Sequence, residues 1–257
     1  MTKTEINSTL QKLKLEDNIP KLKNSECVFI VAQGRSGSTL LLKLLNSIDG
    51  YNICGENHGA LSQLNAFYDS ILRTEKLVPK VENKNLAYSD LIELPSRQDN
   101  YSGFEWYNVY QLNFIEDKLR ELIVGMFNPS QQYRVWGFKE IRFGLGTIYN
   151  HFDINYEKFA SELNFIKQLF PHAKFVFLTR KTENLIKSAW WANNPEQSKK
   201  TLDKQKNLFH EYINNNSNFC YHVCYHDLVN NTHNLHGMYK FVGEKFILEN
   251  YQEALKR

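Results

Sequence analysis

A glycine-containing loop between a strand-like run and an apolar helix constrains the fold of this chain more than any other feature. Residues 27–32 form a continuous hydrophobic run, which is typical of a strand buried on both faces of a parallel sheet. Residues 38–45 follow with the apolar spacing of a helix, and Ser38 stands at its start. Backbone amides and the positive end of the helix dipole converge where such a strand, loop and helix meet. We therefore expect the loop to bind an anion, and an ordinary strand-to-helix turn is the alternative.

The residues of the loop favour the anion site. Two glycines allow a sharp turn close to a phosphate, the hydroxyls add donors, and an arginine adds a fixed positive charge. The candidate residues are Gly34, Arg35, Ser36, Gly37, Ser38 and Thr39. Ser38 stands where the P-loop of an ATPase or GTPase has its lysine, and we find no acidic strand end suited to Mg²⁺. A ligand with a single 5′ phosphoanhydride suits the loop better than a nucleoside triphosphate.

Strand and helix patterns alternate along the rest of the chain. Helices are predicted at 60–73, 111–127, 156–170, 183–191 and 196–215, and the C-terminus is helical with a break at Gly243. Strands are predicted at 51–54, 133–143, 174–179 and 219–225. Such alternation implies right-handed crossovers between parallel strands. The sequence thus predicts a three-layer α/β fold like that of P-loop proteins, in which helices flank a central, mostly parallel β-sheet.

We expect a single domain over residues 25–257, because a chain of 257 residues is within reach of one hydrophobic core. Residues 1–24 are interpreted as an N-terminal arm. Residues 76–110 carry two prolines and many polar residues, and we interpret them as an insertion that contributes to a substrate pocket. The aromatic residues within 101–107, and Trp190 with Trp191, fit that pocket and the core equally well.

Composition narrows the class of protein. Charged residues make up 23% of the chain and the formal net charge is +3, which argues against a nucleic-acid partner and suits a small anionic ligand. No window reaches the length of an apolar membrane span, and residues 1–23 do not resemble a secretory leader, so we expect a cytoplasmic protein. The four cysteines are too few for a disulfide framework, and we expect reduced thiols.

A zinc site within residues 220–226 is an alternative that geometry disfavours. The candidate ligands alternate along one predicted strand, which spreads them over roughly 20 Å. They are Cys220, His222, Cys224 and His226. Zinc requires its donors within about 2.0–2.3 Å of one point, so we expect no metal here.

These elements together resemble the sulfotransferases that use 3′-phosphoadenosine-5′-phosphosulfate (PAPS), in particular bacterial members of the broad family that includes the tyrosylprotein enzymes. The resemblance runs over residues 26–247. In that family a strand, an Arg-Ser-Gly-Ser/Thr-Thr loop and a helix hold the 5′-phosphosulfate, and the loop that begins at Arg35 matches it. A strand that ends in Arg, with a Ser eight positions later on the next helix, binds the 3′-phosphate there. Arg180 and Ser188 match this pair.

Three further positions extend the resemblance. In the tyrosylprotein enzymes a Glu that follows the loop arginine by 21 positions acts as the base, and Glu56 follows Arg35 by 21 positions. A lysine between the two nucleotide elements stabilises the transferring group in the family, and Lys139 occupies that place. Tyr225 opens a segment similar to the family's Tyr-Glu-Asp-Leu segment. The resemblance implies that Glu56 is the base, that Lys139 and Arg35 stabilise the transferring group, and that Tyr225 belongs to the nucleotide site.

The activity implied by the resemblance is a metal-independent, in-line transfer of a sulfuryl group to a hydroxyl acceptor. His58 is a second candidate for the base, because histidine in general titrates near neutral pH, although a lone histidine is more often structural. The implied partners are PAPS, its product 3′-phosphoadenosine 5′-phosphate (PAP), and a saccharide, lipid, peptide or small-molecule acceptor. A P-loop kinase for a small molecule and a nucleotide-binding protein without turnover are the alternatives. The Arg-Lys-Gly loop that many cytosolic sulfotransferases place over the donor has no match in this sequence, so closure of the site must differ.

Overall fold

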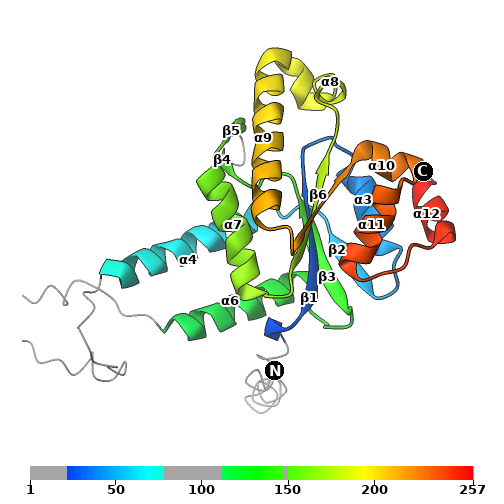
Figure 1. Ribbon diagram of the computed structural model, residues 1–257. Coiled ribbons are helices and arrows are strands. Elements are labelled where there is room, and N and C mark those ends of the chain that lie inside the picture. The colour runs from blue at the N-terminus through cyan, green and yellow to red at the C-terminus, as the bar shows by residue number, and fades with distance from the viewer. Residues whose placement is uncertain (1–21, 78–110, 148–149, 257) are drawn as a thin grey trace, which may run out of the picture.

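The computed structural model describes residues 22–77, 111–147 and 150–256 (Figure 1). Its centre is a five-stranded sheet in the order β2-β3-β1-β6-β7. Every neighbouring pair in this sheet is parallel. The strands are β1 (Glu26–Ala32), β2 (Tyr51–Cys54), β3 (Val135–Glu140), β6 (Lys174–Thr179) and β7 (Cys220–Cys224). The predicted α/β fold with a parallel central sheet is therefore confirmed.

Helices cover both faces of the sheet and complete the three layers (Figure 1). One face carries α3 (Ser38–Asn46), α10 (Tyr225–Asn230), α11 (His233–Val242) and α12 (Leu248–Leu255). The opposite face carries α4 (Ala60–Leu77), α6 (Leu112–Phe127), α7 (Tyr156–Leu169) and α9 (Pro195–Asn215). As predicted, the C-terminal helices are interrupted at Gly243, which caps α11 with a φ of 94°.

The central strand β1 is buried on both faces, as its continuous apolar run predicts. Because successive side chains of a strand point to opposite faces, alternate residues enter different cores. Phe29 and Val31 pack with the helices that include α7 and α9, whereas Val28 and Ile30 pack with those that include α3 and α11. Phe29 meets Phe138 of β3 at a ring-centroid distance of 4.9 Å, within the range of favourable aromatic pairs.

The single helix predicted over 183–191 is wrong. The chain forms a short helix, α8 (Thr182–Leu185), and a separate 3₁₀ turn, η2 (Ala189–Asn193). Ser188 between them is extended, with φ −121° and ψ 130°, and Ala189 has a positive φ of 50°. The break lets the indole of Trp191 reach the carbonyl oxygen of Gly34, to which it donates a hydrogen bond of 3.1 Å. A contact between distant segments has overridden the local helical pattern.

Smaller differences concern the ends of elements. β3 ends at Glu140 rather than at residue 143, and β7 ends at Cys224, so that Tyr225 begins α10. A short antiparallel pair, β4 (Leu145–Thr147) with β5 (Asn150–Ile154), was not predicted, because neither strand forms a strong apolar run.

Several predictions fall partly or wholly outside the described residues. Residues 1–21 of the expected arm, 78–110 of the expected insertion and the aromatic residues of 101–107 are among them. None of the described helices is long and apolar enough to cross a membrane. Cys27 and Cys220 are buried, Cys54 and Cys224 are half-buried, and none of the four forms a disulfide with another described residue.

Gly137 marks the closest approach within the sheet and provides a test of the fold. A Cβ atom at this position would stand 1.8 Å from the carbonyl oxygen of Val28 in β1, which is backbone and cannot turn aside. We expect Gly137→Ala to lower the free energy of unfolding by about 3 kcal/mol or more, at the upper end of overpacking costs. Urea unfolding followed by circular dichroism measures this change.

The matched control is Gly125→Ala in α6. A Cβ at Gly125 has open space around it, and alanine is favoured over glycine inside a helix by about 0.5–1 kcal/mol. This control should therefore be neutral or stabilising. A Gly137→Ala protein as stable as the control would contradict the tight pairing of β1 with β3.

Candidate active site

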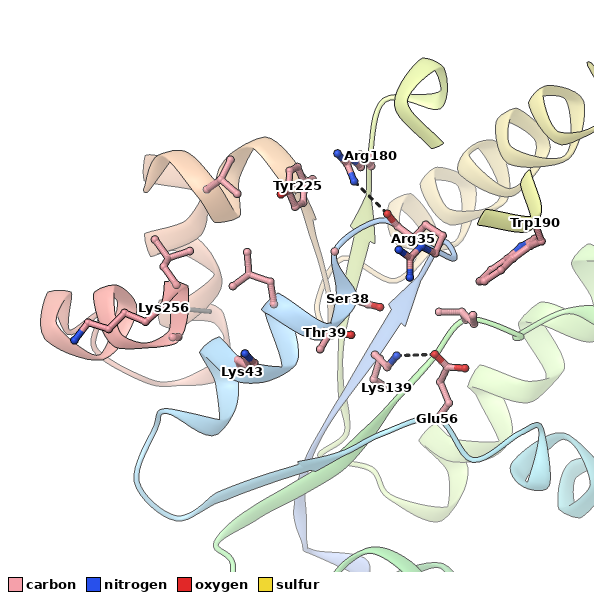
Figure 2. A pocket seen from close by; sticks show the side chains of 16 residues that line it. Arg35, Ser38, Thr39, Lys43, Glu56, Lys139, Arg180, Trp190, Tyr225 and Lys256 are labelled. Carbon is pink, nitrogen blue, oxygen red and sulfur yellow. Dashed lines mark hydrogen bonds and ion pairs between the residues drawn. The ribbon is translucent and has the colours of Figure 1, made fainter. Parts of the chain in front are cut away.

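A cleft of about 500 Å³ lies at the carboxyl ends of the parallel strands (Figure 2). Each strand of the sheet delivers a predicted residue to this edge, because parallel strands all end on the same side. The predicted residues that line the cleft are Arg35, Gly37, Ser38, Thr39, Glu56, Lys139, Arg180 and Tyr225. Lining residues that the sequence analysis had not assigned include Lys43, Ile141, Val229 and Lys256, and Trp190 also lines the cleft.

The loop after β1 has the geometry of an anion cradle. Gly37 has a φ of 98° and Arg35 a φ of 67°, so the backbone turns through the left-handed region on both sides of Ser36. α3 begins at Ser38 with no side-chain cap. Within the described part of the chain, the amides of Ser38 and Thr39 have no backbone acceptor, as is usual for the first turn of a helix. These amides are available to an anion in the cleft.

Two of the predicted loop residues support the loop from behind. Ser36 is fully buried, and its hydroxyl donates a hydrogen bond of 2.6 Å to the carbonyl oxygen of Gln33. Gly34 is buried against Trp190, whose ring lies 2.7 Å from where a Cβ would stand. Neither Ser36 nor Gly34 lines the cleft, so the structure places both of them in the support of the loop.

Tyr225 and Arg180 form the wall beside Gly37. A Cβ on Gly37 would stand 2.5 Å from the ring of Tyr225, so only glycine fits here. The guanidinium of Arg180 lies over the same ring, 4.2 Å from its centroid, at a distance typical of a cation–π contact. Its Nη1 donates to the carbonyl oxygen of Arg35 at 3.3 Å. Its Nε is buried and has no hydrogen-bond partner among the described residues, while the residue itself lines the cleft.

Ser188 does not join Arg180 at the cleft wall. Its hydroxyl accepts a hydrogen bond of 3.3 Å from Nε of Arg35, and the residue is outside the lining of the cleft. The resemblance assigned Arg180 and Ser188 together to a 3′-phosphate, but only Arg180 lines the cleft in this structure. Arg180 faces the cleft, whereas Ser188 holds the side chain of the loop arginine.

Glu56 lies two residues after β2, across the cleft from the loop. It pairs with Lys139, as Figure 2 shows, and also with Arg142. Nζ of Lys139 donates to Oε1 of Glu56 at 2.6 Å, and Nη1 of Arg142 donates to Oε2 at 2.5 Å. Burial acts to raise the pKa of Glu56, but the hydrogen bonds from Lys139 and Arg142 outweigh it and hold the pKa below its ordinary value. Glu56 is consequently ionised at neutral pH, as a general base must be before it accepts a proton.

A second carboxylate, Glu140, ties the loops after β2 and β3 together. It is buried, with 2% of its surface exposed. Its Oε2 accepts hydrogen bonds from the amides of Asn57 and Gly59, and its Oε1 accepts them from the amides of Ile141 and Arg142. One buried side chain thus fixes the loop that carries Glu56 against the strand that carries Lys139.

The sequence analysis missed Arg142 and Glu140. Both follow Lys139 within three residues, inside a strand that was predicted to continue to residue 143. An unbroken strand there would not have indicated that Arg142 bonds Glu56 or that Glu140 accepts amides of the neighbouring loop. The observable signal was the concentration of charge at the end of a buried strand, since Lys139, Glu140 and Arg142 follow a wholly apolar run. Charges at such a place require partners.

His58, the second candidate for the base, occupies a different environment from Glu56. It is exposed, has a φ of 54°, and lies in the turn that precedes α4. It is not part of the lining of the cleft.

The residues of the zinc alternative lie on β7 and at the start of α10. His222 is held by a 2.8 Å hydrogen bond with the hydroxyl of Thr179. Its pKa is lowered to about 4, and burial is the largest cause. Asp227 accepts hydrogen bonds from the amide of Cys224 and from Asn234, which fixes the turn that presents Tyr225. Among the described residues there is no group of three or more His, Cys, Asp or Glu side chains arranged to hold a metal ion.

A sequence profile described as the sulfotransferase family matches residues 27–247. A search of curated proteins gives no significant match.

Solved structures similar to this chain include a sulfotransferase domain from the curacin biosynthetic pathway, with 13% identity, a TM-score of 0.47 and coverage of 91% of this chain and 78% of that one. Sulfotransferase STF9 from Mycobacterium avium has 11% identity, a TM-score of 0.42 and coverage of 97% and 71%. Sulfotransferase STF1 from Mycobacterium tuberculosis has 13% identity, a TM-score of 0.44 and coverage of 94% and 73%. The profile match spans most of the chain, and on that ground this protein belongs to the sulfotransferase family.

Proposed function

We propose that this protein transfers a sulfuryl group from PAPS to the hydroxyl group of an acceptor. The observation that carries the proposal is the content of a single cleft. It combines a loop whose geometry suits an anion, a second arginine, Arg180, and an ionised carboxylate paired with a lysine. The first two features suit a nucleotide with separate anionic groups, and the third suits the removal of a proton beside them.

The charges of the cleft support an anionic donor. Its described lining contains a single carboxylate, that of Glu56, among five cationic side chains. The cationic residues are Arg35, Lys43, Lys139, Arg180 and Lys256. An excess of positive over negative charge in the lining raises the local concentration of anions and stabilises them when they bind.

Each end of the donor has a candidate partner. The amides at the first turn of α3 would hold the 5′-phosphosulfate, together with Arg35, which lines the same cleft. Arg180 lines the same cleft and would hold the 3′-phosphate through its guanidinium. Gly37 lets the ring of Tyr225 pack directly against the backbone of the loop, since a Cβ there would clash with the ring.

The proposed reaction is an in-line displacement at sulfur. The donor supplies an activated sulfuryl group, and a bond forms between the acceptor oxygen and sulfur while the bond from sulfur to the bridging phosphate oxygen breaks. Glu56 accepts the proton of the acceptor hydroxyl. Lys139, Arg35 and the loop amides stabilise the charge that develops on the transferring group and on the leaving oxygen. A sulfuryl group carries less charge than a phosphoryl group, so these cations can take the place that Mg²⁺ has in kinases.

The first prediction concerns the nucleotide. We expect the protein to bind PAP more tightly than 5′-AMP, because only PAP carries the 3′-phosphate. Arg180→Ala should remove most of the difference, about 1.5–3 kcal/mol for charge-assisted hydrogen bonds, or a factor of roughly 10 to 150. Isothermal titration calorimetry measures both affinities. The matched control is Arg134→Ala, which removes an arginine that pairs with Glu244 outside the cleft. Equal affinities of the wild type for the two nucleotides would rule out the donor proposed here.

The second prediction separates transfer from binding. Glu56→Gln keeps the shape of the side chain but removes the base, so turnover should fall by roughly 10²–10⁴ while the affinity for PAP stays within a few fold. Lys139→Ala should lower turnover by at least a comparable factor, because its charge acts on the transition state. The assay follows ³⁵S-labelled sulfuryl transfer from PAPS to a library of saccharide, lipid, peptide and phenol acceptors.

His58→Ala is the control for the assignment of the base. We expect it to retain turnover close to that of the wild type, because His58 is exposed outside the cleft. An inactive His58→Ala protein together with a fully active Glu56→Gln protein would move the base to His58.

The third prediction distinguishes sulfuryl transfer from phosphoryl transfer. Turnover with PAPS should be unchanged in EDTA, because the cations of the cleft are proposed to stabilise the transferring group. The same chelator experiment with ATP as donor tests the kinase alternative. Activity that disappears in EDTA and returns with Mg²⁺ would favour a kinase.

A further inference from the structure

The carboxylate of Glu56 is held by two cations that differ in their relation to the cleft. Lys139 bonds Oε1 and lines the cleft, whereas Arg142 bonds Oε2 and is not part of the lining. Lys139 is therefore placed to reach both Glu56 and a bound donor. Arg142 faces Glu56 from the protein side.

Arg142 is itself fixed from behind. Its Nη1 lies 3.2 Å from Oε1 of Glu140, the buried carboxylate that also accepts the amides of Asn57 and Gly59. Only 14% of the Arg142 side chain is exposed, against 50% for Arg134, which forms a carboxylate pair elsewhere in the chain. Arg142 thus connects the base to the residue that shapes the base's own loop.

In the proposed reaction, Lys139 would have two interactions that compete with each other. Its charge is needed at the transferring sulfuryl group, yet in this structure the same ammonium pairs with Glu56. The side chain of Glu56 is only 23% exposed. If Lys139 were its only cationic partner, the carboxylate would lose much of its stabilisation when Lys139 turned away. A second cation that cannot leave resolves this conflict.

We propose that Arg142 is a positioning residue, which holds Glu56 in place when Lys139 turns from the carboxylate to the sulfuryl group. The inference rests on the proposed function, because it assigns Lys139 and Glu56 their parts in sulfuryl transfer. Arg142 acts through Glu56 and does not touch the substrate.

The charged groups around Glu56 set the direction of the expected effects. Lys139 and Arg142 pair with it directly, Glu140 lies behind Arg142, Arg35 lines the opposite side of the cleft, and His58 is exposed on Glu56's own loop. Removal of Arg142 takes away one of the interactions that lower the pKa of Glu56, while the effect of burial persists. The pKa of Glu56 should therefore rise, and its ionised form should be lost at higher pH than in the wild type.

The first experiment needs no acceptor. Protein labelled with ¹³C at the glutamate δ-carbon is titrated with acid and followed by NMR, and the Glu56 signal is identified by its loss in Glu56→Gln. In Arg142→Gln the Glu56 signal should titrate at higher pH than in the wild type, and in Arg142→Lys it should lie between the two. The matched control, Arg134→Gln, should leave the Glu56 titration unchanged.

The second experiment measures turnover with PAPS and p-nitrophenol, or with the best acceptor from the library. Arg142→Gln should lower kcat by about 10²-fold, a size typical of a misplaced catalytic group, with little change in the affinity for PAP. In a protein that already carries Glu56→Gln, the same substitution should have little further effect, because residues that act as one unit are not additive. Arg142→Lys should restore part of the activity.

The possible outcomes separate the two proposals. A folded Arg142→Gln protein whose Glu56 titrates as in the wild type, or whose loss of turnover multiplies with that of Glu56→Gln, overturns the role of Arg142. A wild-type protein that does not bind PAP overturns the proposed function instead. If Arg142→Gln does not fold, Arg142→Lys gives the same two readouts, and a Glu56 titration and kcat equal to those of the wild type would then count against the role.

Discussion

The parallel pairing of β1 with both β3 and β6 is the constraint on which the site depends. In register, Ile30 pairs with Lys139, and Ala32 pairs with Leu178. The loop after β1, the lysine of β3 and the arginine after β6 therefore reach one edge of the sheet although they are far apart in sequence. Tight packing keeps this register, because Gly137 allows β3 to approach β1 more closely than any side chain would permit.

Paired charge is the second organising element. Glu56, Lys139, Arg142 and Glu140 form a chain of ion pairs in which two carboxylates meet two cations. Each of these charges would be costly to leave alone in a half-buried site. Their mutual pairing offsets the free-energy cost of burying each charge. It also shapes the backbone, since Glu140 accepts hydrogen bonds from amides of the loop that carries Glu56. The proposed catalytic groups, Glu56 and Lys139, and the groups that orient them are thus one connected structure.

Much of the fold could be predicted from local patterns. The apolar runs at 27–32 and 174–179 became β1 and β6, and the helix predicted at 196–215 became α9 with one added residue at its start. These predictions succeed because burial on both faces, or on one face of a helix, leaves a period in the sequence. The prediction over 183–191 failed because the hydrogen bond from Trp191 to Gly34 breaks a segment that has a helical pattern.

The sequence by itself determined the parallel α/β architecture, the loop between β1 and α3, and the family, since each depends on residues that are close together or on motifs that occur in a fixed order. Tertiary structure alone decided that Ser188 supports Arg35 rather than facing the cleft, and that Arg142 and Glu140 stand behind Glu56. Hydrogen bonds and ion pairs between distant segments leave no period in the sequence. They exist only once the strands have brought their carboxyl ends together and burial has made every unpaired charge costly.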